Sequence, residues 1–126
     1  MAVCIKTGDI VWIYGPFPCG RYTDLVIFRR RLKHMLDVDE MVEADDGYPD
    51  EKVRRPNNFR SHSDRRAKKN ARARHETINK RSKDWKVLGA NIYRHRRQSH
   101  KYVFKAVAVC TQISFENGDP PFQVQY

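Results

Sequence analysis

The sequence has no long apolar run and few cysteines. Of its 126 residues, 40% are hydrophobic and 32% are charged, and no apolar stretch approaches the roughly 18 residues that a membrane span needs. Lys6 and Asp9 interrupt the first apolar segment and no small-residue cleavage site follows it, so we expect neither a signal peptide nor a membrane partner. Three scattered cysteines are too few for a disulfide framework or a Cys-x-x-Cys metal site, which indicates a reducing intracellular compartment. They are Cys4, Cys19 and Cys110.

Common catalytic motifs are also missing. The chain contains none of the patterns GxxxxGK[ST], GxGxxG and GxSxG, which removes support for phosphate-cradle NTPases and serine hydrolases. Its five histidines lack the spacing of HExxH or of a zinc knuckle. Nothing in the sequence supports nucleophilic catalysis by a Cys–His pair.

Positive charge is abundant and lies in one segment. The net charge is +10 and the pI about 9.8. Residues 53–101 hold 17 Lys and Arg against 3 Asp and Glu, whereas the segments on either side are slightly acidic. Clustered Lys and Arg displace counterions from phosphates, which predicts a nucleic-acid partner; a solvated basic surface or a disordered arm is the alternative. The candidate DNA-binding residues are Arg65, Arg66, Arg72, Arg74, Lys80 and Lys83.

The first half of the chain predicts short strands and one helix. Residues 3–5 and 9–14 are short apolar runs joined around Gly8, which is typical of a β-hairpin. Thr23 and Asp24 are both suitable N-caps for a helix that follows them. Residues 41–44 form a further candidate strand, which we expect to pair with the hairpin.

The second half predicts two long helices. Residues 64–85 contain no Gly or Pro and are rich in Arg, Lys and Ala, which are good helix formers. Residues 102–115 carry apolar side chains at helical spacing and predict a packing helix, with a buried strand as the alternative. The expected packing positions of that helix are Val103, Ala106, Val107, Cys110 and Ile113. The pair Tyr102 and Phe104 is expected in the core, with a base-stacking platform as the alternative.

Three acids occupy positions that suit a metal site. Asp24 lies at a turn into a helix, Asp45 (or Asp46) follows the 41–44 strand, and Glu76 is the only acid in the interior of the basic helix. Carboxylates at strand ends, with a third on a facing helix, can hold two Mg²⁺ or Mn²⁺ ions that stabilise both oxygens of a phosphodiester exchange. We therefore expect these carboxyl groups to lie within about 10 Å of one another. Capping and turn roles are the alternative.

Several segments in order carry a resemblance to a known family. Residues 3–12 and 15–20 suit a hairpin and its closing turn, and residues 22–29 place an acid before a small helix. Residues 45–48 read Asp-Asp-Gly-Tyr, and residues 72–83 contain Arg-x3-Glu-x6-Lys. Together with residues 116–120, these segments resemble Harbinger-type DDE superfamily endonucleases, the transposase domains of eukaryotic DNA transposons. The resemblance runs from about residue 2 to residue 125.

The resemblance implies an α/β fold of the ribonuclease H-like type, a mixed sheet with flanking helices. It implies metal-dependent DNA cleavage and strand transfer in the nucleus. Asp45 and Glu76 would be catalytic metal ligands, with Asp24 as a further ligand, and the metal would be Mg²⁺ or Mn²⁺. Arg72 and Lys83 would contact DNA phosphates beside the metals.

One departure from the family pattern concerns the first acid. In the family it lies on a strand upstream of the hairpin, and here no Asp or Glu precedes Asp9. We therefore expect residues 1–126 to be a partial DDE endonuclease domain, incomplete at the N-terminal edge of its sheet and inactive alone. A partner or a second copy would supply the missing segment. The alternatives are a domesticated, non-catalytic DNA-binding remnant and a small basic RNA-associated protein.

Overall fold

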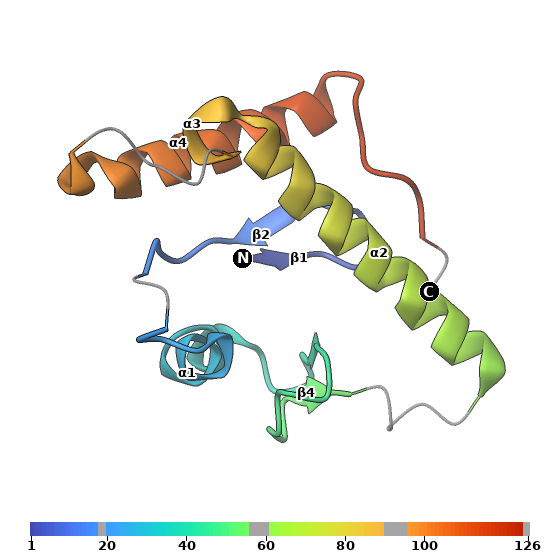
Figure 1. Cartoon of the computed structure of the whole chain (residues 1–126). Helices are drawn as coiled ribbons and strands as arrows, with labels where there is room; N and C mark the ends of the chain where they lie inside the picture. Colours follow the sequence, from blue (N-terminus) through green and yellow to red (C-terminus); the bar gives the residue numbers. More distant parts are fainter. Residues whose placement is uncertain (18–19, 56–60, 90–95, 125–126) are drawn as a thin grey trace. The chain divides into compact units, whose positions relative to one another are not determined.

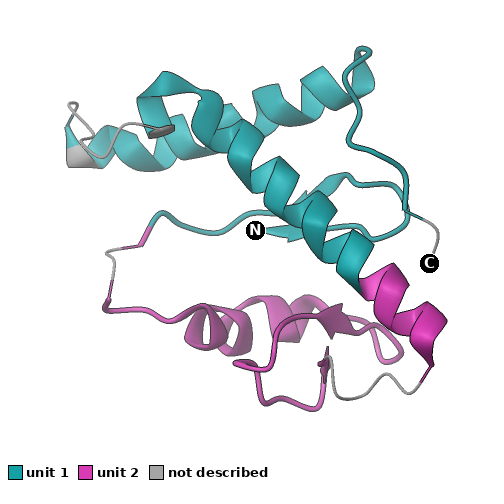
Figure 2. Cartoon of the chain, turned by 45° about the vertical axis from the view of Figure 1, so that its right-hand side comes forward, with its two compact units in different colours: residues 1–16, 69–126 teal, residues 17–68 magenta. Residues whose placement is uncertain are grey.

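The computed structural model describes residues 1–17, 20–55, 61–89 and 96–124 (Figure 1). The chain divides into two units (Figure 2). Unit 1 consists of Met1–Pro16 and Lys69–Tyr126, and unit 2 consists of Phe17–Lys68. No helix in the described residues is both long and apolar enough to cross a membrane. Cys4 and Cys110 are free thiols, and Cys19 of the expected 15–20 turn lies outside the described residues.

The N-terminal hairpin of unit 1 confirms the expectation from the sequence. Strands β1 (Ala2–Val3) and β2 (Ile10–Trp12) pair antiparallel. Gly8 has φ 89°, a value that L side chains rarely adopt, and this residue closes the turn. Two backbone hydrogen bonds of 2.9 Å, from Cys4 N to Asp9 O and from Gly8 N to Cys4 O, hold the connection between the strands.

Helices make up most of the rest of unit 1. Helix α2 (His62–Asp84), which begins in unit 2, is followed by the single turn of α3 (Lys86–Gly89) and by α4 (Arg97–Glu116). Both long helices were expected, and the strand alternative for residues 102–115 is wrong. Asn117 is the C-cap of α4, and its backbone N–H donates to Ile113 O at 3.0 Å.

The packing face of α4 differs from the expected one. Of the predicted positions only Val107 is buried, whereas Ala106, Cys110 and Ile113 are exposed. The buried face instead contains Val107, Ala108, Thr111 and Phe115. Apolar side chains occur on several sides of this helix, and burying the large ring of Phe115 removes more apolar area from water than burying Ala106 or Cys110.

Besides the start of α2, the described residues of unit 2 form one short helix, a 3-10 turn and two short strands. Helix α1 (Asp24–Arg30) is followed by η1 (Leu32–Met35), β3 (Val42–Glu43) and β4 (Val53–Arg54). Phe28 and Val53 form its buried apolar centre. Lys52 Nζ donates to three backbone carbonyls of the segment before β3, at 2.5–3.3 Å, and so ties that segment to the start of β4. The three acceptors are Asp37 O, Val38 O and Glu40 O.

Strand β3 confirms the expected strand at residues 41–44, but its observed partner was not predicted. It pairs in parallel with β4, with Val42 opposite Val53 and Glu43 opposite Arg54. The described strands thus form two sheets of two strands each. The chain has the expected mixed content of helix and strand. Joining the strands of the two units into one ribonuclease H-like sheet stays a prediction.

Candidate nucleic-acid interface and carboxylate residues

Basic side chains repeat along one side of α2. Lys69, Arg72, Lys80 and Lys83 are all exposed. At about 100° per residue, they fall within an arc of roughly 80° and span roughly 21 Å of helix. We call these four residues, all in unit 1, the basic face of α2. The buried residues Arg74 and Ile78 lie on the opposite side of the helix.

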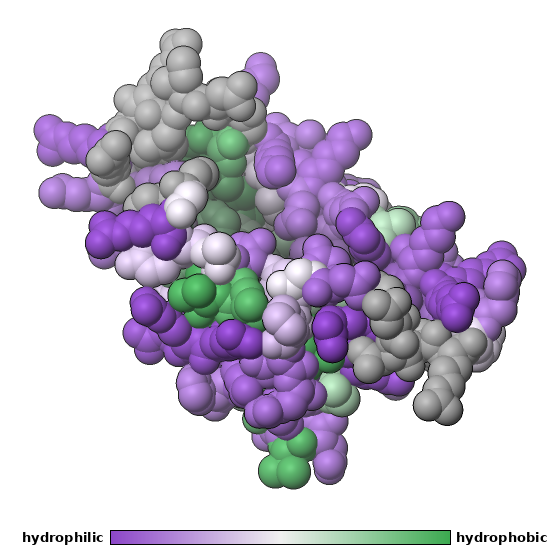
Figure 3. Space-filling model, turned by 60° about the horizontal axis from the view of Figure 1, so that its bottom comes forward, coloured by the Kyte–Doolittle hydropathy of each residue, from purple (hydrophilic) through white to green (hydrophobic). Residues whose placement is uncertain are grey.

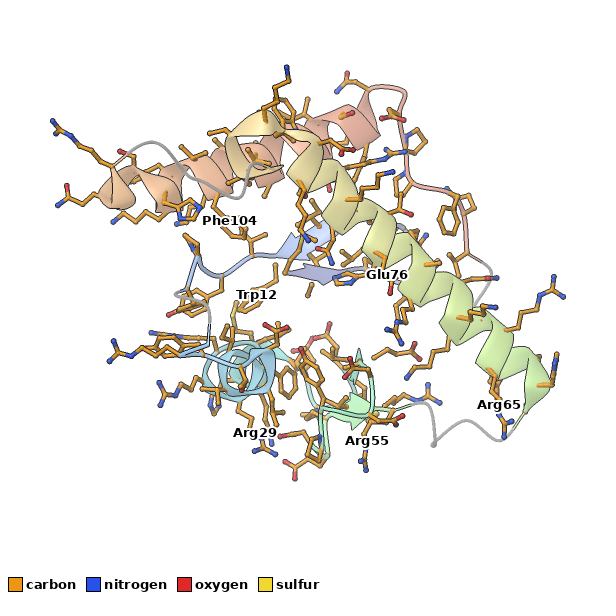
Figure 4. All side chains as sticks on the ribbon, in the orientation of Figure 1. Trp12, Arg29, Arg55, Arg65, Glu76 and Phe104 are labelled. Atoms are coloured by element: carbon orange, nitrogen blue, oxygen red, sulfur yellow. The ribbon has the colours of Figure 1, made fainter. Side chains whose placement is uncertain are left out.

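The candidate DNA-binding residues Arg65 and Arg66 lie on different sides of α2. Arg65, in the first turns of α2, is exposed and continues the spacing of the basic face (Figure 4). Arg66 is exposed as well, but it lies about 100° away from Arg65 around the helix. Lys69 was missing from the candidates, although the spacing that includes Arg65 and Arg72 also includes Lys69.

Arg74, also a candidate DNA-binding residue, lies in the interior of unit 1 and not on the basic face of α2. Only 1% of this residue is exposed, and its guanidinium donates to the backbone carbonyls of Cys4 and Ile5 in the hairpin turn. Burial lowers the pKa of the guanidinium. Two residues along a helix correspond to about 200° of rotation, so Arg72 faces solvent while Arg74 faces the hairpin.

Glu76 is an exposed residue of α2 (Figure 4). Its Oε1 lies 3.1 Å from Nε of Arg72 in an i, i+4 ion pair, and both side chains are more than 60% exposed. Exposed pairs of this kind contribute only about 0.3–0.5 kcal/mol to stability. Glu76 is therefore accessible, and it occupies the same side of α2 as the basic face.

Asp24 and Asp45 both have local structural roles in unit 2. Asp24 is the first residue of α1, next to the N-cap Thr23, whose Oγ1 accepts a hydrogen bond from Val26 N at 3.4 Å. Asp45 Oδ1 accepts a hydrogen bond from Gly47 N at 3.1 Å within a turn. The turn alternative is confirmed for Asp45, whereas the side chain that caps α1 is that of Thr23 and not that of Asp24.

The same two acids lie close to one phenol. Burial, which has the largest effect, and the nearby carboxylates of Asp24 and Asp45 together raise the pKa of Tyr48 to about 12. The structure thus brings two of the three predicted metal ligands near one side chain, that of the tyrosine in the Asp-Asp-Gly-Tyr segment. The phenol of Tyr48 stays protonated at neutral pH.

The third predicted ligand belongs to the other unit. Glu76 is part of unit 1, whereas Asp24 and Asp45 are part of unit 2, so the convergence of the three carboxylates stays a prediction. Across the described ranges, no group of three or more His, Cys, Asp or Glu side chains could hold a metal ion. Asp24 and Asp45 with a protonated phenol do not make the ligand set of a two-metal centre, and we assign no reaction step to metal ions.

The sequence did not predict that the carboxylate of Glu43 is buried. Both carboxylate oxygens of Glu43 are buried and have no hydrogen-bond partner among the described residues, and burial raises the pKa of this group. Lys68 lies nearby and donates from Nζ to Ala44 O and Arg54 O at 3.0 and 2.9 Å. Burial lowers the pKa of Lys68. An acid in a two-residue strand carries no sequence signal of this environment.

Comparison with known proteins finds no family model, no curated protein and no solved structure that matches the chain.

Proposed function

We propose that this chain binds duplex DNA through phosphate contacts made by the basic face of α2, as a DDE-endonuclease-like domain. The observation that carries this proposal is the exposure of four cations within a narrow arc of one helix. The resemblance to DDE endonucleases supports DNA, and hence the nucleus, over other polyanions. Hydrophilic side chains cover most of the surface seen in Figure 3.

The cations of the basic face are available for phosphates. Lys69, Lys80 and Lys83 form no ion pair with the residues that the structure describes, and Arg72 is paired only with the exposed Glu76. Each contact with a phosphate releases condensed counterions from duplex DNA. Four contacts predict a slope of about −3.6 in a plot of log K against log salt concentration.

The test is a salt titration by fluorescence anisotropy with a labelled duplex. The double variant Lys80→Gln and Lys83→Gln should reduce the magnitude of the slope by about 1.8. Lys6→Gln with Lys86→Gln is the matched control, since it removes the same charge from two exposed lysines of unit 1 outside the basic face. The control should leave the slope unchanged. A flat salt dependence, or an equal loss of slope in both double variants, would show that the basic segment is a solvated surface that does not bind phosphates.

The variant Glu76→Gln distinguishes DNA binding from DNA cleavage. Because Glu76 is the acid on the side of α2 that carries the basic face, Glu76→Gln should strengthen duplex binding if the face contacts phosphates. A nicking assay on supercoiled plasmid with Mg²⁺ or Mn²⁺ tests the activity that the resemblance implies. Nicking that disappears in Glu76→Gln would add catalysis to the proposal. Tighter binding to duplex RNA than to duplex DNA would favour the RNA-associated alternative and contradict the proposal.

A further inference from the structure

A cavity of about 250 Å³ lies in unit 1, away from the basic face of α2. The segment after β2 lines it with Ile13, Tyr14 and Gly15, and α4 lines it with Lys101, Phe104 and Lys105. Figure 4 shows Phe104 on α4. The cavity therefore combines two aromatic rings with two ammonium groups.

The sequence of α4 explains why these three side chains share one side of the helix. Lys101, Phe104 and Lys105 stand at i, i+3 and i+4, which are neighbouring positions on a helix surface. Phe104 extends the buried face that ends at Phe115, but at this end of α4 it is only half-buried. One side of the Phe104 ring is therefore packed, and another side of the ring lines the cavity.

The segment after β2 contributes an exposed ring and bare backbone. Tyr14 is 39% exposed, and its ring centroid lies 5.8 Å from that of Trp12. Gly15 has φ 138° and lines the cavity without a side chain, which allows a ligand to approach the backbone closely.

The charge of the cavity indicates an anion. Neither Lys101 nor Lys105 forms an ion pair within the part of the chain that the structure describes. Lys101 Nζ lies 4.8 Å from the centroid of Tyr102, which keeps the ammonium near aromatic surface. An uncharged apolar ligand would leave both ammonium groups without an anionic partner, whereas a nucleotide presents a flat base to the rings and a phosphate to the lysines.

We propose that this cavity holds one unstacked base of a single-stranded nucleic acid, with Lys101 and Lys105 on the adjacent phosphates. Aromatic side chains stack on bases of any sequence, and basic grooves follow the backbone of single strands. The small volume suits a single base better than a larger ligand. The proposal rests on the proposed function, because it adds a single-strand site to a domain that binds duplex DNA.

The probe is an oligothymidine strand, measured by anisotropy beside the duplex used above. Phe104→Leu should weaken binding of the oligothymidine roughly tenfold and leave duplex binding unchanged. Lys101→Gln with Lys105→Gln should reduce the magnitude of the salt slope for the single strand by about 1.4. Phe122→Leu is the matched control, since it makes the same change at an exposed ring of unit 1 that does not line the cavity, and it should bind as the parent does.

Tryptophan fluorescence gives a second readout. The chain has two tryptophans, so a Trp85→Phe background leaves Trp12 as the reporter beside Tyr14. Oligothymidine should change the emission of Trp12, and Phe104→Leu should reduce this response at a fixed strand concentration. If Phe104→Leu fails to fold, as judged by circular dichroism, the lysine pair decides the result.

The outcomes separate this inference from the proposed function. Unchanged single-strand affinity and slope in the cavity variants would overturn the inference, while loss of the duplex slope in the α2 variants would still support duplex binding. Equal loss of single-strand and duplex affinity in the cavity variants would also overturn it. Binding of free thymidine monophosphate as tight as that of the strand would assign the cavity to a free nucleotide instead.

Discussion

Replacing Arg74 by methionine tests the conclusion that this arginine stabilises unit 1 and does not bind DNA. The guanidinium donates to two carbonyls of the hairpin turn, at Cys4 and Ile5. Hydrogen bonds from a charged donor contribute about 1.5–3 kcal/mol each. Cys4 O also accepts from Gly8 N, and the buried Nη1 of Arg74 has no hydrogen-bond partner among the described residues. Removing that unsatisfied group recovers about 1–3 kcal/mol, so we expect a net loss of roughly 2–3 kcal/mol.

Urea unfolding followed by circular dichroism measures this loss. With a slope of about 1–3 kcal/mol per M, the midpoint should fall by about 1–2 M. Arg72→Met is the matched control, two residues along α2 and exposed. It should change the free energy of unfolding by no more than about 0.5 kcal/mol and remove about 0.9 from the magnitude of the DNA salt slope.

Two results would contradict an interior, stabilising role for Arg74. An Arg74→Met midpoint equal to that of the parent would show that the two carbonyl contacts do not stabilise the hairpin. A loss of about 0.9 from the magnitude of the salt slope in folded Arg74→Met would show that the side chain reaches phosphates. Either result would refute the assignment of Arg74 to the interior.

Two further predictions concern titrating groups of unit 2. The ion pairs of Asp50 with Lys33 at 2.9 Å and with Arg29 at 3.0 Å hold its pKa at about 2, below the ordinary value of 3.8. The stability that these ion pairs contribute is present above pH 3.8 and is lost as the pH falls through about 2. The urea midpoint of the parent should therefore fall over this pH range, and that of Asp50→Asn should fall less. Parallel curves for the two proteins would contradict the pairing. Burial and the Asp24 carboxylate raise the pKa of Tyr48 to about 12, so stability should fall as the pH rises from 10 to about 12. In a tyrosinate absorbance titration, with Tyr48→Phe identifying the signal, Asp24→Asn should lower this pKa, and an unchanged value would contradict their proximity.

Local sequence determined the elements of this chain. Gly8 between two short apolar runs is sufficient for a hairpin, because a turn that needs positive φ strongly prefers glycine. The absence of Gly and Pro from residues 64–85, together with their many Arg, Lys and Ala residues, predicted the long helix α2. The side of α2 that carries Lys69, Arg72, Lys80 and Lys83 follows from helix geometry and spacing alone.

Part of the candidate site was equally readable from the sequence. Thr23 as a cap and Asp45 as a turn residue follow from contacts within three residues along the chain. The sequence predicted that Asp24 and Asp45 would lie close together, but nothing in it predicted that Tyr48 would lie near both acids. Strand β4 was not predicted, because a strand of two residues carries no periodicity to detect.

Tertiary structure decided which charged and apolar residues of each helix are buried. Arg72 and Arg74 carry the same charge two residues apart, and only the carbonyls of the hairpin turn distinguish the buried one from the exposed one. In α4, apolar residues lie on several sides of the helix, so the sequence did not determine which side packs. The structure shows that the side with Phe115 is buried. Local sequence sets backbone conformation through interactions over a few residues, whereas burial depends on what distant segments bring to each face.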